Sequence, residues 1–529
     1  MGWVRVTRRR ASPIFAAAPL ALLAAEGCGS RTTASAVEGP PECLRDEDCE
    51  GGGDRCFPVR CTLGTCQELA PVVCEDQDPC TRDVCDPATG ACLHPDAAAD
   101  LDRDGHLGIL PGKLAGEAGA CGDDCNDRNA AAFPGGNEIC DGVDNDCNGV
   151  VDDGSLLAPS GEAVLVSEGT AAVEPTSLTF ANGNYLAALN GEINDRNVLL
   201  TVPITRTGAR AAVPTPLSAI PADVTGGSLV WIGDRLGITW SDRRDALGGI
   251  LNFEVYFTLL NPDRTKRLAD LRLTHADGFS LGATIAFTGL EFVVLWQDDG
   301  QNVFSIDEIH GQRLDRDGAL VGGNVELMSE GPQTQTAPAV AAGRRSLGVT
   351  WVRGEAAQSH RVIFAPFDFE LRHLAPATVL SNTAHAVYPT IVYSEPQFII
   401  AWYEDPPGPN IFGAVRDDLG QEVVRAKVIT SGNRHARTPA LLPFGDRVLL
   451  VWADDRDGNA GYELYTKMLD RRLEPLGPEQ RLTNARGDSI DPVLAFGPGG
   501  DVGILFSDNR PGVPQTFFTR LGCEPSKAR

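Results

Sequence analysis

Two short runs of alternating acidic residues carry the best-defined chemistry in this chain. Residues 100–105 read D-x-D-x-D-G, and residues 144–152 read D-x-D-x-N-G-x-x-D. Alternate oxygen-bearing side chains converge on one point when the backbone wraps around it, and glycine at the sixth position permits the sharp turn this requires. The carbonyl of the seventh position supplies a further oxygen. Both runs therefore predict loops that bind a hard cation, and calcium is the usual one outside the cell.

Both runs depart from a complete EF-hand. Where an EF-hand has a bidentate Glu at position twelve, the first run has Pro111 and the second has Ser155, and Gly108 stands at position nine of the first. Without the bidentate group we expect weak sites, with dissociation constants on the order of 10⁻⁴–10⁻³ M, as in extracellular modules. The alternative is an acidic turn that binds no metal.

The remaining ligands must come from nearby, and Asp123, Asp124 and Asp127 are the local candidates. His106 and Val150 would act through their backbone carbonyls. The predicted metal ligands are Asp100, Asp102, Asp104, His106, Asp124, Asp127, Asp144, Asp146, Asn148, Val150 and Asp152.

A near copy of the first run serves as a control within the same chain. Residues 314–318 repeat residues 101–105 almost letter for letter, but Arg313 takes the place of Asp100. Nothing acidic follows within reach, so this copy predicts a turn and not a metal site.

The cysteines indicate the kind of framework that must hold these two acidic loops in place. Thirteen of the 15 lie between Cys43 and Cys147, and residues 41–154 hold 26 acidic against 7 basic residues. Large apolar residues are too few here to build a core, so a disulfide framework is expected. Zinc is the alternative, but there is no CxxC pair and only His94 is near. The disulfide candidates are Cys43, Cys49, Cys56, Cys61, Cys66, Cys74, Cys80, Cys85, Cys92, Cys121, Cys125, Cys140, Cys147 and Cys523.

Because thirteen is an odd number, one cysteine of this segment has no local partner. If Cys28 carries lipid, Cys523 is the remaining candidate. We therefore predict a disulfide from Cys523 to the metal-binding segment.

The N-terminus predicts export. Four arginines between positions 5 and 10 precede a short apolar stretch from Ile14 to Ala25, which is typical of a secretory signal and too short to span a membrane. The Gly27-Cys28 that follows resembles the end of a bacterial lipoprotein signal, which implies lipidation of Cys28; simple cleavage nearby is the alternative. We expect a signal peptide at 1–27, a flexible linker at 28–41, and a location at the outer membrane or cell surface, or else in the periplasm or the medium.

Two resemblances cover the acidic segment. Residues 42–95 contain CEDQDPCTRDVCDPATGACLHP, which resembles a short Cys repeat of slime-mould matrix proteins and implies extracellular spacing or adhesion. Residues 96–154 end in GNEICDGVDNDCNGVVDDG and look like the MopE-type metal-binding repeat of myxobacterial surface proteins. That family's label mentions copper, but the hard oxygen ligands of this chain argue for calcium.

The rest of the chain is periodic. From Ala163 onward one pattern recurs seven times at a period of 50–56 residues: an apolar strand ends in an aromatic residue, usually Trp, and an acid follows. Four short strands in about 53 residues are typical of a propeller blade. Residues 155–529 therefore predict a mainly β fold with a seven-bladed β-propeller. Residues 163–166 would complete the last blade beside residues 515–520 and cover a sheet edge.

The repeats resemble bacterial sialidase-like propellers, but the enzymes' Asp-box, S-x-D-x-G-x-T-W, is absent. No arginine triad, HExxH motif, G-x-S-x-G elbow or P-loop can be identified. The acids after the aromatic positions predict strand-end caps rather than catalysts. These are Asp242, Asp298, Asp454 and Asp508, with Arg243, Arg456 and Arg510 as expected partners.

The formal charge of −27 argues against nucleic acid or an anionic membrane as a partner, so membrane contact is expected only through a lipid anchor. The leading hypothesis is a non-enzymatic surface protein with a calcium-loaded disulfide stalk and a propeller that binds an extracellular protein or glycan. A propeller glycoside hydrolase is the alternative, which a converging cluster of acids and arginines on one face of the ring would favour. A purely structural surface component is the third possibility.

Overall fold

The computed structural model describes residues 42–49, 54–110, 113, 117, 119–136, 143–147, 155–159, 161–167, 171–217, 223–245, 252–275, 278–300, 307–328, 333–355, 359–405, 408, 410–431, 435–458, 461–497 and 500–525. The chain divides into two compact units, with the boundary between Ala97 and Ala98. Over the described ranges, no helix has the length and apolar character needed to cross a bilayer. The predicted signal peptide, the linker and Cys28 lie outside these ranges.

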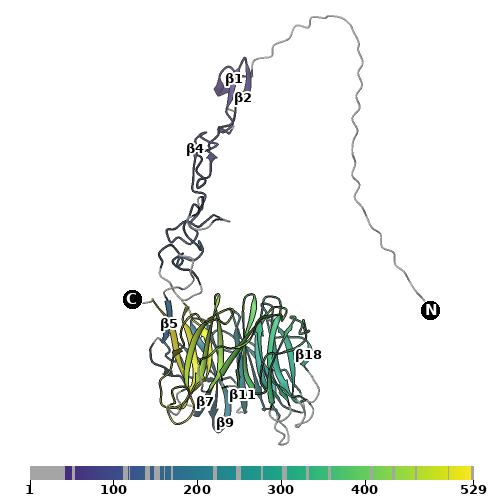
Figure 1. The fold of residues 1–529 in the computed structure, drawn as a ribbon. Helices are drawn as coiled ribbons and strands as arrows, with labels where there is room; N and C mark the ends of the chain where they lie inside the picture. Colours follow the sequence, from purple (N-terminus) through teal and green to yellow (C-terminus); the bar gives the residue numbers. More distant parts are fainter. Residues whose placement is uncertain are drawn as a thin grey trace, which may run out of the picture. The chain divides into compact units, whose positions relative to one another are not determined.

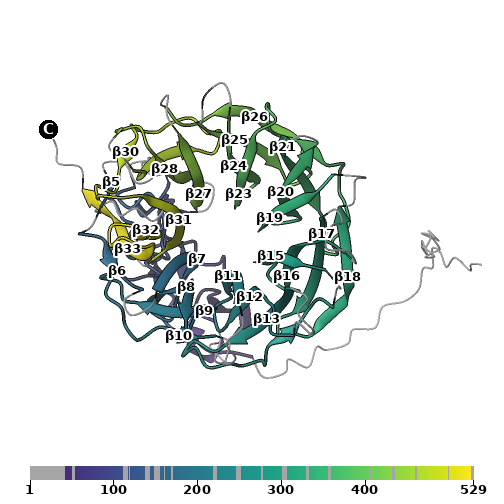
Figure 2. The ribbon, with the colours of Figure 1, turned by 90° about the horizontal axis from the view of Figure 1, so that it is seen from below.

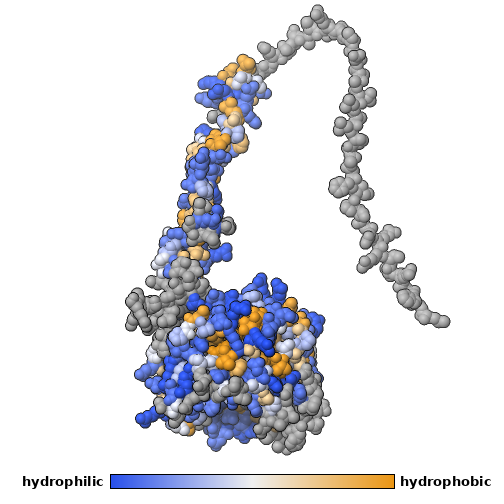
Figure 3. All heavy atoms as spheres, in the orientation of Figure 1, coloured by the Kyte–Doolittle hydropathy of each residue, from blue (hydrophilic) through white to orange (hydrophobic). Residues whose placement is uncertain are grey.

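The first unit is built from very short elements. They are η1 (Asp46–Cys49), β1 (Val59–Thr62), β2 (Thr65–Glu68), β3 (Val84–Cys85) and β4 (Cys92–Leu93). Large apolar side chains such as Leu44 and Leu63 are exposed, and hydrophobic groups are scattered among hydrophilic ones on its surface (Figure 3). With so little apolar burial, the unit must be constrained covalently.

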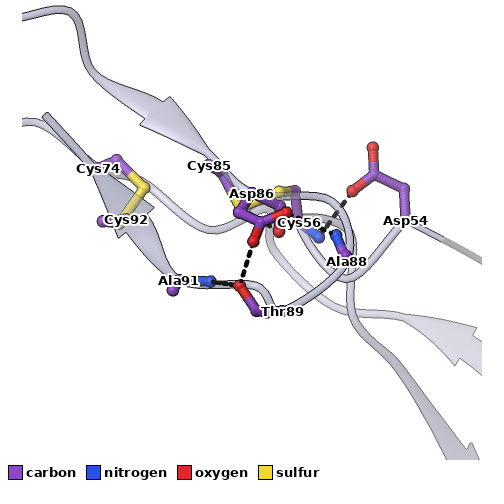
Figure 4. The surroundings of a disulfide bond; sticks show 9 residues. All are labelled: Asp54, Cys56, Cys74, Cys85, Asp86, Ala88, Thr89, Ala91 and Cys92. Carbon is purple, nitrogen blue, oxygen red and sulfur yellow. Dashed lines mark hydrogen bonds between the residues drawn. A yellow bond between two sulfur atoms is a disulfide. The ribbon is translucent and has the colours of Figure 1, made fainter. Parts of the chain in front are cut away.

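Disulfides supply that constraint. They join Cys43 to Cys61, Cys49 to Cys66, Cys56 to Cys85 and Cys74 to Cys92 in the first unit, and Cys125 to Cys147 in the second. Figure 4 shows two of them, with turns in which the carboxylates of Asp54 and Asp86 accept the N–H groups of Cys56 and Ala88 at 2.9 Å. Cys80 and Cys121 are also disulfide-bonded. The prediction of a disulfide-rich N-terminal region is confirmed, while Cys140 lies outside the described residues.

The second unit contains seven antiparallel sheets arranged around a common axis, which confirms the predicted seven-bladed propeller (Figures 1 and 2). From the axis outward, the first six are β7 (Ala171–Ala181), β8 (Asn184–Ile193), β9 (Arg196–Ile204) and β10 (Thr215–Pro216); β11 (Val224–Trp231), β12 (Leu236–Asp242), β13 (Glu254–Leu260) and β14 (Leu271–Arg272); β15 (Ser280–Phe287), β16 (Glu291–Asp298), β17 (Glu308–Asp315) and β18 (Leu320–Met328); β19 (Gln335–Ala342), β20 (Leu347–Glu355), β21 (Ser359–Phe367) and β22 (Thr378–Val379); β23 (Ala386–Ser394), β24 (Gln397–Glu404), β25 (Asn410–Asp417) and β26 (Glu422–Val428); β27 (Ala436–Phe444), β28 (Arg447–Asp454), β29 (Glu463–Asp470) and β30 (Gln480–Arg481).

The seventh sheet closes the ring with strands from both ends of the propeller. It comprises β31 (Ser489–Phe496), β32 (Val502–Asp508) and β33 (Gln515–Pro525), with β5 (Ser155–Pro159) and β6 (Val164–Leu165) beside β33 (Figure 2). Leu165 lies opposite Phe517, as the closure prediction requires. β5 adds a second pairing that the sequence pattern did not predict, with Leu157 opposite Cys523.

The recurrent tryptophans are core residues. Trp240, Trp296, Trp351, Trp402 and Trp452 are completely buried. Several stack on a ring of the neighbouring strand, as Trp240 does on Tyr256 at a centroid distance of 5.9 Å. The period seen in the sequence is therefore the period of blade packing, because an aromatic residue at this position fills the space between neighbouring sheets.

A candidate metal centre in the acidic segment

Residues 100–105 form a loop that gathers three carboxylates. The Asp100 carboxylate accepts the main-chain N–H groups of Arg103, at 2.6 Å, and of Gly105, at 3.2 Å. Arg103 and Gly105 have φ angles of 68° and 100°, in the left-handed region that bends the chain back on itself. One oxygen from each of Asp100, Asp102 and Asp104 lies within 4.8 Å of the other two. The first acidic run thus brings its alternate side chains together.

Two of these carboxylates keep an oxygen that is buried and unpaired. The N–H of Asp104 donates to Oδ1 of Asp102 at 3.3 Å, and the N–H of His106 donates to Oδ1 of Asp104 at 2.8 Å. The Oδ2 atoms of Asp102 and Asp104 are buried and have no hydrogen-bond partner within the described part of the chain. Burying a carboxylate oxygen without a partner is costly, and a bound cation removes that cost.

Asp124 reaches the same place from twenty residues further along the chain. Its backbone pairs with the first loop, because Gly108 and Asp124 form a parallel bridge and the N–H of Asp124 donates to the Leu107 carbonyl at 3.1 Å. The side chain is only 1% exposed, and its Oδ2 is also buried without a partner among the described residues. Burial, together with the nearby carboxylates of Asp104, Asp102 and Asp127, raises the pKa of Asp124, although a hydrogen bond from the Asn126 N–H opposes this.

Asp127 occupies the place that the ninth loop position leaves open. A Cβ atom on Gly108 would lie 2.6 Å from the carboxylate carbon of Asp127. The Asp127 Oδ1 atom accepts the N–H of Leu101 at 2.7 Å, which fixes the carboxylate beside the loop. The glycine that departs from the EF-hand pattern therefore makes room for a carboxylate from another part of the segment.

The His106 side chain makes contacts of its own. Its Nδ1 atom lies 3.3 Å from Oδ1 of Asp123, and its ring stacks on Phe133 with centroids 5.1 Å apart. Asp123, one of the three local candidates, is therefore paired with this imidazole. The His106 carbonyl stays the predicted ligand.

The donor set fits a hard divalent cation. The side-chain donors that meet in the loop are carboxylates. The sulfur atoms of Cys125 and Cys147 lie within 4.8 Å of the Asp124 carboxylate, but they form a disulfide and cannot act as thiolate ligands. Calcium takes six to eight oxygens in a flexible geometry. Asp100, Asp102 and Asp104, completed by Asp124 and Asp127, would hold it.

The second acidic run is described only in part. Asp144 and Asp146 are present in the described residues, while Asn148, Val150 and Asp152 lie outside them. The run is positioned by the Cys125–Cys147 disulfide and by Asn145, which is fully buried and donates from Nδ2 to the Ala131 carbonyl at 3.2 Å. Among the described residues, Asp144 and Asp146 are not gathered with a third ligand.

The near copy at residues 314–318 is a turn between β17 and β18, as predicted. Oδ1 of Asp315 accepts the N–H groups of Asp317 and Ala319 at 2.9 and 2.8 Å. The Asp317 carboxylate pairs with Arg235. These hydrogen bonds and this ion pair thus explain the positions of the Asp315 and Asp317 carboxylates without a bound metal ion.

The acids after the tryptophans are structural, as predicted, with one correction of partner. Trp240 and Trp452 donate from Nε1 to Asp242 and Asp454 at 3.3 and 3.0 Å. Asp454 and Asp508 pair with Arg456 and Arg510. Asp242, however, pairs with Arg244 and not with Arg243, which pairs with Asp223. The sequence prediction chose the adjacent arginine, but in the turn after β12 the N–H of Arg244 donates to Oδ1 of Asp242 at 2.7 Å, and the Arg244 guanidinium returns to the same carboxylate.

A cluster that sequence reasoning missed lies where three neighbouring innermost strands begin. Arg437 on β27 stacks over Tyr462 at 3.9 Å, and its Nε is buried and unpaired among the described residues. Burial raises the pKa of Asp491 on β31; the charge of Arg437 lowers it, and Glu174 on β7 raises it further. Asp491 has a φ of 53°, part of a bulge that recurs in the innermost strands, and bulges re-aim side chains. Arg437 and Asp491 come from consecutive blades, and the ring closure brings Glu174 of the first blade beside the seventh, so no local signal reveals the cluster.

Comparison with known proteins finds one family model, which covers part of the acidic segment. Residues 124–153 match the family model Cu-binding MopE, described as "Putative metal-binding motif". No curated protein matches this chain.

Several solved structures are similar to most of the chain at low identity. A protein of unknown function from Dyadobacter fermentans is 12% identical, with a TM-score of 0.41, over 70% of this chain and 100% of its own. Trypanosoma rangeli sialidase is 10% identical, with a TM-score of 0.38, over 58% of this chain and 56% of its own. Penicillium chrysogenum α-L-arabinanase is 12% identical, with a TM-score of 0.40, over 60% of this chain and 98% of its own. The chain is thus similar to a metal-binding motif over 30 residues and, at low identity, to these solved structures over its larger part.

Proposed function

We propose that this chain is an exported, lipid-anchored surface protein in which a calcium-stabilised, disulfide-bonded stalk carries a propeller that binds protein or glycan partners. The observation that carries the proposal is the convergence of the carboxylates of Asp100, Asp102 and Asp104 in one loop. Asp102, Asp104 and the neighbouring Asp124 each have a buried oxygen that has no partner among the described residues. Such a convergence is unfavourable without a cation and favourable with one.

Calcium would take the place of a hydrophobic core. In the described part of residues 98–154, the buried apolar side chains are Ala98, Ala120 and Ala132. Their small surfaces contribute little burial energy. Neutralising the gathered carboxylates would therefore decide whether this segment is ordered.

Calcium titration of the chelator-treated full chain tests the metal. We expect calcium to raise the temperature at which the segment melts, followed by circular dichroism, and Asp102→Asn with Asp124→Asn to abolish that shift. Asp317→Asn in the near-copy turn is the matched control and should keep it. An equal calcium response in the double variant and the wild type would contradict the proposal.

The propeller's role is supported by the cluster around Arg437. A guanidinium with an unpaired buried Nε among the described residues, the Tyr462 ring beneath it and the carboxylates of Asp491 and Glu174 combine the groups that polar ligands use: a ring face, a cation and hydrogen-bond acceptors. A glycan or a polar protein loop has the matching chemistry.

The same cluster favours glycoside hydrolysis as the second candidate, because two carboxylates beside an arginine could act as acid and base. A glycan array and a panel of chromogenic glycosides separate the two. Binding without turnover, lost on Arg437→Ala, supports the binding role. Turnover that Asp491→Asn abolishes while binding persists supports the hydrolase, and the absence of any saturable ligand would make the propeller a structural component.

The anchor needs its own test, since it rests on the sequence alone. Metabolic labelling with a fatty acid should mark the wild type and not Cys28→Ser. Equal release of both proteins into the soluble fraction would contradict anchoring.

A further inference from the structure

Two blades share a constellation of arginines and carboxylates at the start of their third strand. In the second blade Arg272 donates to Glu254 at 2.6 Å, beside Tyr256. In the sixth blade Arg481 donates to Glu463 at 2.8 Å, in the same way beside Tyr465. Strand register makes these positions equivalent, because Tyr256 pairs with Arg272 and Tyr465 pairs with Arg481.

A second arginine completes each constellation. Arg244 bonds to Asp242 and lies 4.6 Å above the Tyr256 ring. Arg456 pairs with Asp454 and lies 4.5 Å above Tyr465. Each of these two blades therefore places two guanidinium groups among carboxylates around one buried tyrosine. The same arginines also pair with Asp245 and Asp270 in the second blade and with Asp457 and Glu479 in the sixth.

The third blade has the same strand register but has neither of the two arginines. Trp296 pairs with His310 as Trp240 pairs with Tyr256, and His310 pairs with Glu326 as Tyr256 pairs with Arg272. Gly300 stands where Arg244 does, two residues after the strand-end acid. Its N–H donates to Oδ1 of Asp298 at 2.9 Å, as that of Arg244 donates to Asp242 at 2.7 Å.

Three carboxylates and one imidazole thus stand where the second and sixth blades combine carboxylates with two arginines. Asp298, Glu308 and Glu326 take these positions, and the flanking stretches 301–306 and 329–332 contain no Lys, Arg or His. Arg313, on the same strand, pairs with Glu291 at 3.3 Å. Among these three blades, the third is the one that has no arginine at either of the two equivalent positions, which Gly300 and Glu326 occupy.

The ligand atoms of Glu308, His310 and Glu326 all lie within 4.8 Å of one another, and Nε2 of His310 is 3.5 Å from Oε2 of Glu308. Residues two apart on a strand face the same side, and Glu326 joins them from the paired strand. The side chains of His310 and Glu308 are 23% and 31% exposed, so an ion from solvent can reach them.

We propose that Glu308, His310 and Glu326 form a binding site for a divalent first-row transition cation such as Zn²⁺. One imidazole and two carboxylates suit these metals better than calcium, which prefers oxygen donors alone. Three protein ligands at a partly exposed position leave coordination places for water or for a donor atom of a bound partner. The ion takes the electrostatic place that the two arginines hold in the second and sixth blades.

Zinc titration by calorimetry of the full chain tests the site, with His310→Tyr plus Glu326→Arg as the variant. These substitutions recreate the residue types of the second and sixth blades, so the fold should be kept and the Glu308 carboxylate should gain a guanidinium partner. We expect the wild type to bind one more equivalent of Zn²⁺ than the variant. Zinc should also raise the melting temperature of the wild-type propeller. In the variant, the part of this rise that comes from the additional bound Zn²⁺ should be absent.

Single variants and the stalk provide the controls. Glu326→Arg alone and His310→Tyr alone should each lose the same equivalent, while Asp102→Asn with Asp124→Asn, which tests the stalk site, should keep it. Equal zinc stoichiometry in the wild type and the doubly substituted propeller, with both proteins folded by circular dichroism, would overturn the assignment.

Discussion

The space around single residues explains why the calcium-loop pattern is broken in this chain. Gly108 stands at the position where an EF-hand has a ligand, and the structure places the Asp127 carboxylate within 2.6 Å of where a Cβ would be. A departure that seemed to weaken the site is therefore the condition for recruiting a carboxylate from elsewhere in the segment. Filling the space beside Gly108 should therefore weaken metal binding more than it destabilises the fold.

Gly108→Ala tests this at the residue scale. The new methyl group must displace Asp127, so we expect calcium affinity to fall about tenfold, equivalent to about 1.4 kcal/mol. Calorimetric titration measures it. Gly477→Ala is the control, since a Cβ there meets no atom within 4 Å. Unchanged affinity in Gly108→Ala would exclude Asp127 from the site.

Glu479 links stability to pH. Burial acts to raise the pKa of Glu479, but hydrogen bonds from Arg456 and Ser431 outweigh it and hold the pKa below its ordinary value of 4.5. Because the folded pKa is the lower one, the carboxylate stabilises the fold above about pH 4.5, and this contribution disappears as the pH falls through the folded pKa.

We therefore expect Glu479→Gln to lower the stability of the propeller at pH 7 by about 1–3 kcal/mol, since it weakens hydrogen bonds to a charged group. Its melting temperature should fall less steeply than that of the wild type as the pH drops from neutral through the folded pKa of Glu479. Parallel pH profiles for the two proteins would show that Glu479 is not the linked group.

Among the elements, the closure of the seventh blade combines segments from opposite ends of the propeller sequence. β33 pairs with β32 on one side and with β6 and β5 on the other. Without β5 and β6 the edge of β33 would be open to solvent and to other chains, and open edges promote aggregation. The stability of the whole ring should therefore depend on β5 and β6.

Deletion of residues 155–167 tests the closure. We expect a lower melting temperature for the propeller and concentration-dependent aggregation, followed by light scattering. Limited proteolysis of the wild type should leave a fragment that begins near residue 155 and keeps its C-terminus. A deletion variant that melts like the wild type would show that the ring closes without these strands.

At the scale of the whole molecule, the cysteine count supports the predicted disulfide between the metal-binding segment and Cys523 of the propeller. Twelve of the thirteen cysteines from Cys43 to Cys147 are in disulfides, and the remaining one is Cys140. Cys523 lies opposite Leu157 on β5, which directly follows the metal-binding segment in sequence. We therefore narrow the predicted partner of Cys523 to Cys140.

Peptide mapping under non-reducing conditions should recover the Cys140–Cys523 pair, and Cys523→Ser should lower stability by about 2–4 kcal/mol, the usual effect of losing a disulfide. Equal amounts of free thiol at Cys523 before and after reduction would refute the pair.

The amino-acid sequence by itself determined the number of blades, the disulfide-rich segment and the first acidic loop. Each is a local or periodic signal: Trp at blade spacing, clustered cysteines, and Asp at alternate positions before Gly105. Only the tertiary structure decided that the backbone of Asp124 pairs with the loop, that Asp242 pairs with Arg244, and that Glu326 faces His310. These contacts depend on strand register and on backbone pairing between segments that are distant in sequence. A short window of neighbouring residues contains no information about either.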